Sequence, residues 1–522
     1  PPRPYAAPTP MKQTHILPRL AAGCSCLAAI LPDAAAQYAP PPSPAPFAGF
    51  VNEQLRKRDP SWKSWDLSGS VRLRYELREN HLAAPPNSDF ATAETARSVN
   101  PGGISNDNSY FASKVLARVG YTDRWWGALV EGRSSAVTGD SRGAAPNIPS
   151  GASPESDGPV DLHQGFVTLG NLKEFPLSLK VGRQELNYGD QRVIGGFAWN
   201  NIGRVFDAAK MRWQNDWFGV DAFTGRIVVP DDNNFNVAND YEWFSGLYFD
   251  TKKLPGHHAE VYALARNAGT GAASLKAPGV TPAPFNPSAR DIYTLGVWLR
   301  SGTNWTGNFD YTVELAGQLG NWKRPATGVR PGERDDHEAF AAPVNVGYTL
   351  PDVAGRPRFA LEYAYGSGDS DPDDGTHGAF DNLYPTNHKF YGYMDLVPWQ
   401  NVHNLRAIFE LKPLPRLSTA IEAHALWLAD TGDRFYNVAG IARQAPGPAG
   451  APGSGRGYGL NPGYDSFLGY ELDVVAGYAL TKFATLEAGY ARFFRGNYVR
   501  QTFSMVGSQD ADWFYAQLLV RF

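Results

Sequence analysis

Cysteine is almost absent from this chain. The 522 residues include only Cys24 and Cys26, and both lie in the first forty residues. The remainder of the chain therefore gains no stability from disulfide bonds. A large excess of one charge is also lacking, because the formal net charge is −4. Composition thus gives no argument for a nucleic-acid partner, and we predict none.

Long apolar runs are missing as well. No stretch of about 18 uninterrupted apolar residues follows residue 40, which excludes membrane-spanning α-helices there. The mean hydropathy is −0.37. Charged residues make up 19% of the chain, which is low for a soluble protein, whereas aromatic residues reach 13%.

The first residues have the features of a secretory signal peptide. Met11-Lys12 begins a short basic region, residues 20–31 form an apolar run (LAAGCSCLAAIL), and Ala34-Ala35-Ala36-Gln37 provides the small residues of a cleavage site. We predict cleavage near Ala36, with residues 1–10 upstream of the true start. Lipoprotein processing at Cys24 is the alternative, but the apolar run before it is short.

From Trp65 onward, segments of about ten residues alternate apolar with polar or small side chains. A period of two predicts strands with one apolar face, and the chain offers about eighteen of them. The clearest are residues 67–77, 111–121, 293–299, 309–319, 359–365, 405–411, 417–427, 468–478 and 514–522. Less regular ones lie at 126–135, 160–169, 177–183, 204–213, 217–228, 243–252, 258–266, 336–349 and 483–494.

The connections between these strands alternate in length. Short ones lie at 121–125, 170–176, 214–217, 252–258, 301–308, 351–356, 412–416 and 480–483. Each connection that falls between two of these short ones along the chain is long. A soluble sandwich has no reason to gather its long loops at one end, whereas a membrane barrel has short periplasmic turns and long outer loops. Only a closed barrel satisfies the strand backbone in lipid, so we predict an antiparallel transmembrane β-barrel of about 18 strands.

The final segment, FYAQLLVRF, fits the last strand of such a barrel. Its apolar face includes Phe514, Leu518, Val520 and the terminal Phe522. Bacterial outer-membrane proteins end similarly, and the barrel assembly machinery reads that segment, so these four residues are our assembly signal. Six tryptophans near strand ends suit an aromatic girdle at the membrane surface, namely Trp125, Trp126, Trp217, Trp305, Trp427 and Trp513.

Residues 181–213 (VGRQELNYGDQRVIGGFAWNNIGRVFDAAKMRW) resemble the alginate export family of outer-membrane porins. Residues 380–395, 399–406, 468–480 and 486–494 also fit, and the resemblance spans residues 62–522. It implies an 18-stranded barrel, in agreement with the count above. The best-known cargo in this family is the polyanion alginate, which passes through an arginine-rich pore. The motifs identify the family better than the cargo.

Alternation places many charged side chains on the inner face of the barrel. The first seven strands supply Arg72, Arg74, Lys114, Arg118, Arg133, Lys180, Lys210 and Arg212, with Arg183 at a strand end and Glu131 as an offsetting acid. Later strands supply more acids, among them Glu471 and Asp473, together with Arg406. We predict a pore lining with one basic and one more acidic wall, which favours a broad saccharide channel over a strictly anion-selective one. The alternative is that these arginines only pair with neighbouring acids.

The loop after residue 366 offers two further candidate sites. Asp369, Asp371 and Asp373 have the spacing of the first oxygen ligands of a calcium loop, although a proline interrupts them and no acid follows at the twelfth position. Calcium is therefore our only candidate cofactor. His377 and His388 lie near acids, but no GxSxG, HExxH or cysteine-nucleophile pattern stands out, and we predict no enzyme.

These observations predict three regions: upstream residues plus a cleaved signal peptide (1–36), a Pro-rich periplasmic linker with room for a helical turn (37–62), and an outer-membrane barrel of the alginate-export type (63–522). The predicted function is passive diffusion of saccharides, including an anionic exopolysaccharide such as alginate. A general small-solute porin, or a receptor or adhesin with a closed lumen, are the alternatives. The expected partners are outer-membrane lipid and lipopolysaccharide, the barrel assembly machinery and the saccharide cargo, and the expected state is a monomer.

Overall fold

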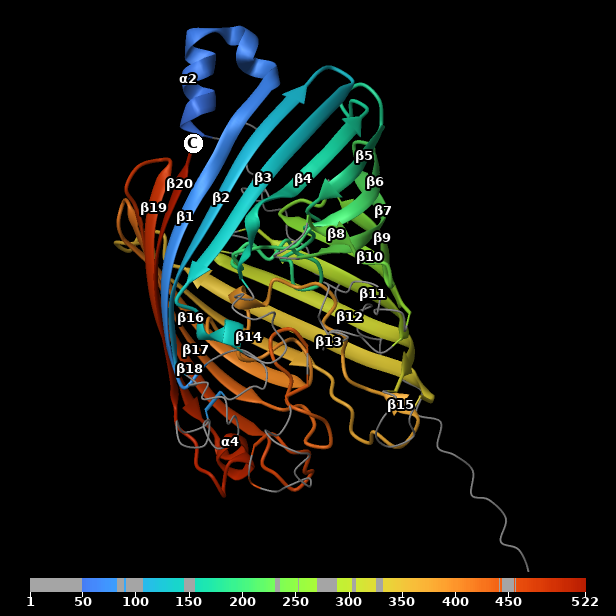
Figure 1. Cartoon of the computed structure of the whole chain (residues 1–522), viewed down its shortest axis with the longest axis vertical. Coiled ribbons are helices and arrows are strands. Elements are labelled where there is room, and N and C mark those ends of the chain that lie inside the picture. The colour runs from blue at the N-terminus through green and yellow to red at the C-terminus, as the bar shows by residue number, and fades with distance from the viewer. Residues whose placement is uncertain are drawn as a thin grey trace, which may run out of the picture.

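The barrel closes between the first and last strands of the chain. In this computed structural model β1 (Trp65–Glu79) pairs antiparallel both with β2 (Asn108–Thr122) and with β20 (Ala511–Arg521). Eighteen long strands thereby form one antiparallel sheet without a free edge (Figure 1). A closed sheet satisfies its own backbone donors and acceptors, as the interior of a bilayer requires.

The structure describes residues 49–522, apart from 82–88, 91–106, 145–154, 231–234, 252, 270–288, 303–306, 325–331, 441, 444–454 and 456. The predicted signal peptide lies outside the described residues. Among those described, no helix is long and apolar enough to cross a bilayer.

The other long strands follow one another around the wall. They are β3 (Trp126–Thr138), β4 (Asp157–Leu169), β5 (Leu177–Gln184), β6 (Phe206–Gln214), β7 (Phe218–Val229), β9 (Glu242–Thr251), β10 (His257–Ala268), β11 (Arg290–Ser301), β12 (Phe309–Lys323), β13 (Arg334–Thr349), β14 (Arg358–Gly366), β16 (Val402–Leu414), β17 (Leu417–Trp427), β18 (Phe467–Ala479) and β19 (Ala484–Arg495). Two-residue strands, β8 (Val237–Ala238) and β15 (Thr376–His377), pair with the last residues of β7 and with the first residues of β13. All eighteen predicted strands are confirmed.

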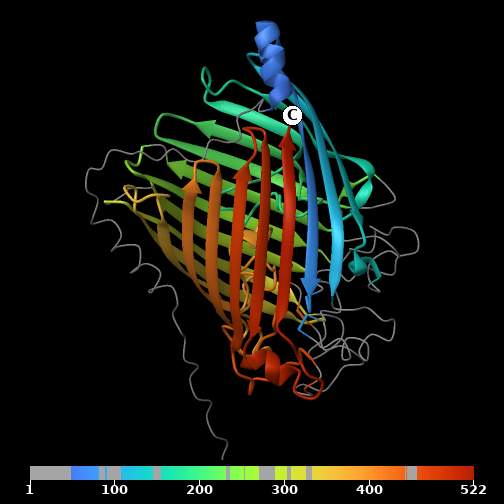
Figure 2. The same cartoon turned by 90° about the vertical axis from the view of Figure 1, so that its left-hand side faces the viewer.

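The two ends of the barrel differ as the loop lengths predict. Figure 2 shows the C-terminus and helix α2 (Phe50–Arg58) at one end, and the short helix α4 (Asn497–Thr502) at the other. The turns next to the C-terminus are short, and the loop that carries α4 is long. This arrangement matches periplasmic turns at the first end and outer loops at the second.

The predicted linker contains more structure than one helical turn. Helix α2 is followed by the 3-10 helix η1 (Pro60–Ser64), which leads into β1. Asn52 donates a hydrogen bond to Asp66 (2.8 Å), and Glu53 forms an ion pair with Lys482 (2.5 Å). The Phe50 ring also packs against Phe483, with the ring centroids 6.1 Å apart. Helix α2 is therefore fastened to the periplasmic rim of the barrel.

The outer face of the barrel is apolar, as alternation predicts. On β1, the side chains of Leu73, Tyr75 and Leu77 are exposed, whereas the intervening charged side chains are buried. Trp125, Trp126 and Trp217 are exposed at the periplasmic ends of strands, consistent with an aromatic girdle.

One of the predicted girdle tryptophans is misplaced. Trp513 faces the interior, is buried, and donates from Nε1 to Glu76 Oε2 at 2.9 Å. Its assignment to the girdle was therefore wrong, because alternation along β20 directs Phe514 outward and Trp513 inward. Trp305 lies outside the described residues.

The terminal residue takes part in closing the barrel. Phe522 and Gly69 exchange two backbone hydrogen bonds, each 3.0 Å long, so the ladder between β1 and β20 runs to the last residue. The ring of Phe522 also occupies the space in front of Gly69. A Cβ atom on Gly69 would lie 2.6 Å from the Phe522 ring and 2.2 Å from the carbonyl oxygen of Leu116.

We predict that Gly69→Val lowers the free energy of unfolding by about 1–3 kcal/mol, because the new side chain overlaps the ring and the neighbouring strand. Urea unfolding of the barrel in lipid vesicles measures this change. Gly317→Val is the matched control, since a Cβ on this glycine meets no atom within 4 Å. Equal stability of the two variants would contradict the close packing of Phe522 on Gly69.

Candidate functional site

Two outer loops fold back into the lumen. The first inner loop (residues 185–205) joins β5 to β6, and the second inner loop (residues 378–401) joins β14 to β16. They meet in a short parallel contact, where Gly195 N–H donates to Tyr384 O (2.8 Å) and Tyr384 N–H donates to Val193 O (3.0 Å). Figure 1 shows irregular chain running between the near and far walls of the barrel.

The basic wall of β1 to β3 holds the first inner loop. Arg72 donates to the backbone oxygens of Ala198 (2.9 Å) and Asn200 (3.3 Å), and to Asn201 Oδ1 (3.2 Å). Lys114 Nζ also reaches Asn200 O, at 3.3 Å. These loop carbonyls have no strand partner, so the cationic side chains supply the hydrogen bonds that a buried backbone needs.

Arg74 and Arg133 extend the same contact. Arg74 donates to Trp199 O (2.7 Å) and forms ion pairs with Glu76 and Glu155, each at 2.8 Å. Arg133 donates to Ile202 O (3.1 Å) and pairs with Asp157. The four cations Arg72, Arg74, Lys114 and Arg133 are all buried, with side chains that contact protein.

The opposite wall holds the second inner loop and part of the first. Arg192 in the first inner loop forms an ion pair with Glu362 on β14 (2.6 Å). Asp381 in the second inner loop pairs with Arg266 (2.8 Å) and Arg290 (2.6 Å) on β10 and β11. The charged residues of the lumen therefore position both loops from several sides.

Aromatic rings fill the space between the loops and the wall. Trp199 stacks on His388 of the second inner loop, with ring centroids 3.9 Å apart, and the Arg74 guanidinium lies 4.2 Å from the Trp199 ring. On the other side of the lumen, Tyr188 stacks on Tyr248 of β9 at 3.9 Å. Such contacts make the two loops a packed internal layer.

Four predicted pore-lining cations lie in the periplasmic half of the barrel, where Lys210 Nζ is 5.6 Å from the ring of Tyr188 in the first inner loop. They keep part of their surface exposed and are Arg118, Lys180, Lys210 and Arg212. Arg118 pairs with the buried Glu131 (2.6 Å), and Arg212 pairs with Asp221 (2.9 Å) and Asp250 (2.7 Å). Lys180 lies opposite Lys210 in the strand register, so like charges adjoin there.

The remaining predicted residues are buried in the wall. Arg183 pairs with Asp207 (2.7 Å) and donates to Asn236 O (3.0 Å). Arg406 pairs with Glu422 (2.5 Å), and Glu471 Oε1 accepts from the Met394 N–H of the second inner loop (2.9 Å). Asp473 is buried beside these groups on β18.

The three aspartates of the calcium hypothesis have separate partners. Asp371 Oδ1 accepts from the Asp373 N–H (3.1 Å), Asp373 lies 3.9 Å from Arg324, and the Asp369 N–H donates to Asp433 Oδ2 (3.0 Å). Within the described part of the chain, only Glu422, His424 and Asp473 bring three potential ligand atoms within 4.8 Å of one another.

The sequence reasoning missed the two inner loops. Their apolar content was the available signal, since the second inner loop includes Phe380, Phe390, Tyr391 and Trp399, all buried. Large apolar side chains are usually buried, so a loop that contains this many of them is expected to pack against protein.

Comparison with known proteins agrees with this geometry. The sequence profile described as "Alginate export" matches residues 90–509. This chain belongs to the alginate export family. Comparison with curated protein sequences finds no match.

Solved structures support the barrel of this family member. Acinetobacter baumannii OccAB1 is similar with a TM-score of 0.52 at 12% identity, over 88% of this chain and 97% of that one. Pseudomonas aeruginosa OccK1 (OpdK) is similar with a TM-score of 0.51 at 10% identity, over 88% and 98%. At such low identity the similarity shows the fold alone. Family and fold together identify an outer-membrane channel of the porin type.

We predict that Arg72→Ala raises single-channel conductance and its fluctuation, because the first inner loop loses three hydrogen bonds. The free energy of unfolding falls by about 2 kcal/mol for the same reason. Planar-bilayer recording and urea unfolding measure the two effects. Arg118→Ala is the matched control, because it removes the same charge from the lumen, while the ion-pair partners of Arg118 among the described residues are Asp66 and Glu131 on the strands. If both variants change conductance alike, Arg72 acts through its charge alone.

The outer loops also predict a pH dependence. Burial and the neighbouring Asp433 raise the pKa of Asp369 from 3.8 to about 7. The folded state therefore holds more protons than the unfolded state between these values, and its stability falls as pH rises through that window. We expect hydrogen exchange in residues 366–377 to speed up by roughly tenfold between pH 5 and pH 8, after correction for the intrinsic rate.

Asp369→Asn should flatten this pH dependence, because the amide does not titrate. Asp371→Asn is the control, since Asp371 is exposed and the amide oxygen can still accept from the Asp373 N–H. An equally steep profile in the Asp369 variant would assign the effect to another group.

Proposed function

We propose that this outer-membrane channel passes saccharides by passive diffusion and favours anionic ones. The observation that carries the proposal is the half-exposed basic group Arg118, Lys180, Lys210 and Arg212 in the periplasmic half of the lumen. A narrow, low-dielectric passage strengthens the attraction between such cations and a carboxylate-bearing solute.

The acids beside these cations limit the selectivity. Glu131, Asp221 and Asp250 each form an ion pair within the group, so the net positive charge is small. Membership in the alginate export family supports an anionic saccharide as cargo. The balanced charge supports a channel that also admits neutral saccharides.

A second candidate function follows from the inner loops. They contact both walls and are packed with aromatic rings, which is the arrangement expected of a receptor whose lumen is closed. Such a protein would bind its partner on the outer loops and conduct no ions at rest.

Bilayer recording of the refolded barrel separates these functions. We expect an open channel with a modest preference for Cl⁻ over K⁺, and block by alginate oligomers at lower concentration than by neutral maltooligosaccharides of equal length. An open channel that ignores both sugars would indicate a general small-solute porin. The absence of ionic current would support the closed receptor.

Lys180 is the residue that best tests the anionic preference, because it adjoins Lys210 and lies 3.6 Å from the centre of the Phe166 ring. Lys180→Gln should weaken alginate block roughly threefold, the loss expected from one partly exposed charge. Lys173→Gln is the control, since Lys173 is exposed on the periplasmic turn before β5. Equal block in all three proteins would contradict the role of the basic group.

A further inference from the structure

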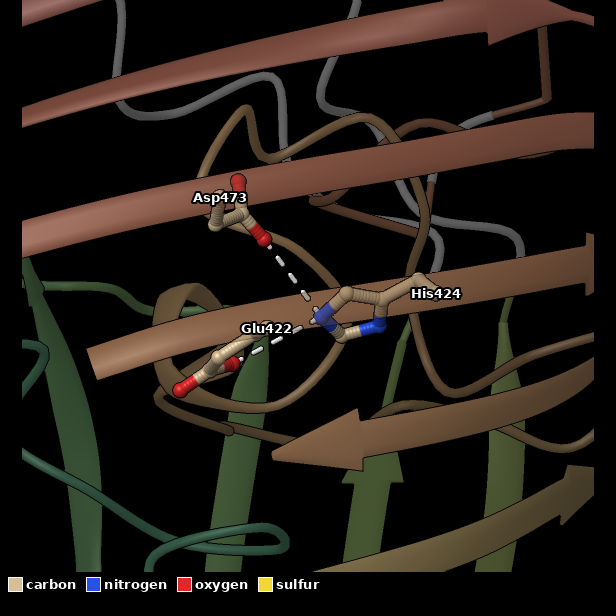
Figure 3. Close-up of side chains that lie close together, drawn as sticks. All are labelled: Glu422, His424 and Asp473. Carbon is tan, nitrogen blue, oxygen red and sulfur yellow. Dashed lines mark ion pairs between the residues drawn. The ribbon is translucent and has the colours of Figure 1, made fainter. Parts of the chain in front are cut away.

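Four polar side chains form a square on the inner face of β17 and β18. The strand register places Glu422 directly opposite Asp473, and His424 directly opposite Glu471. Paired residues in an antiparallel sheet have Cβ atoms about 5 Å apart, so all four side chains project into the same small volume. Figure 3 shows the His424 ring directed between the carboxylates of Glu422 and Asp473.

The proton position on His424 is fixed by its neighbours. The Asn404 side-chain amide donates to Phe390 O at 3.2 Å, which leaves Asn404 Oδ1 as the acceptor facing His424. His424 Nδ1 lies 3.0 Å from that oxygen and therefore carries a hydrogen. A neutral His424 then presents the lone pair of Nε2 to the two carboxylates, the tautomer in which histidine binds metal ions.

The distances from His424 Nε2 to the two carboxylates fit ligands of a shared metal ion better than hydrogen-bonded partners. His424 Nε2 lies 3.6 Å from Glu422 Oε2 and 3.5 Å from Asp473 Oδ2, beyond the usual range of about 2.7–3.2 Å for N–H···O bonds. Nitrogen and oxygen ligands about 2.0–2.2 Å from a tetrahedral zinc ion lie about 3.3–3.5 Å apart. The three ligand atoms all lie within 4.8 Å of one another, so small side-chain movements bring them to one ion.

The negative charge of the cluster also favours a bound cation. Arg192 neutralises Glu362, and Arg406 pairs with Glu422 and Glu362. For Glu471 and Asp473, the described residues offer no ion pair with lysine or arginine, and both oxygens of Asp473 as well as His424 Nε2 are buried without a hydrogen-bond partner. Unneutralised buried carboxylates are costly, and one divalent cation would balance two of them.

We propose that Glu422, His424 and Asp473 bind a divalent transition-metal ion, with Glu471 as the nearest additional carboxylate. One imidazole nitrogen with carboxylate oxygens favours zinc and its first-row neighbours over calcium or magnesium, which prefer oxygen alone. The ion would stabilise the second inner loop, because Glu471 and Asn404 both bond to the backbone of that loop. This site is independent of the saccharide proposed as cargo.

Zinc binding to the untagged, refolded barrel tests the proposal after treatment with a chelator. We expect one zinc ion per chain by calorimetry and metal analysis, and a rise in melting temperature on addition of zinc. Cobalt in place of zinc should give the visible absorption of a tetrahedral site in the wild-type protein, which requires no variant to fold. Failure of the wild-type barrel to bind zinc or cobalt would overturn the proposal. A protonated His424 would then be the cation that balances the buried carboxylates.

Variants locate the bound ion. His424→Gln and Asp473→Asn keep the approximate shape of each side chain and should each weaken zinc binding at least tenfold. His377→Gln is the matched control, because it makes the same substitution at a histidine outside the cluster. His377 Nδ1 lies 3.0 Å from an imidazole nitrogen of His337. Unchanged affinity in both test variants, or loss of binding in the control alone, would place the ion elsewhere and refute this site.

Discussion

The whole architecture depends on one requirement, that every backbone N–H and C=O removed from water finds a partner. The wall meets it by closing on itself between β1 and β20. The inner loops cannot meet it in that way, because only a short stretch of each pairs with the other. Carbonyl oxygens of the first inner loop instead accept from Arg72, Arg74, Lys114 and Arg133. Much of the charge inside the barrel is therefore structural.

Because many of the lumen cations bind loop backbone or carboxylates, a lumen rich in arginine can still have weak anion selectivity. A guanidinium that already donates to a carbonyl and a carboxylate has little capacity left for a passing solute. Among the predicted pore-lining cations, only the four in the periplasmic half retain exposed surface, and acids lie beside most of them. The passage that a solute meets is consequently more balanced in charge than the number of inward arginines suggests.

The strands could be predicted from the sequence because lipid and protein impose opposite demands on alternate residues. Leu73 and Arg74, for example, had to face opposite sides. The course of the loops could not be predicted, since alternation carries no information about where a connection lies. Trp513 was misassigned because only its position near a strand end was considered, although alternation with the outward Phe514 places it on the inner face. The cluster of Glu422, His424 and Asp473 required the register between β17 and β18, which a single sequence does not specify.

The contact between Phe522 and Gly69 has a consequence for biogenesis. The closing ladder joins β20, which follows all the other strands along the chain, to β1, which precedes them, and Phe522 and Gly69 pair across this seam. The seam can therefore be completed only after β20 has been synthesised, when every other strand already exists. A chain that ends before β20 retains an open strand edge, however well its other strands pair. This unpaired edge distinguishes the incomplete product from a closed barrel.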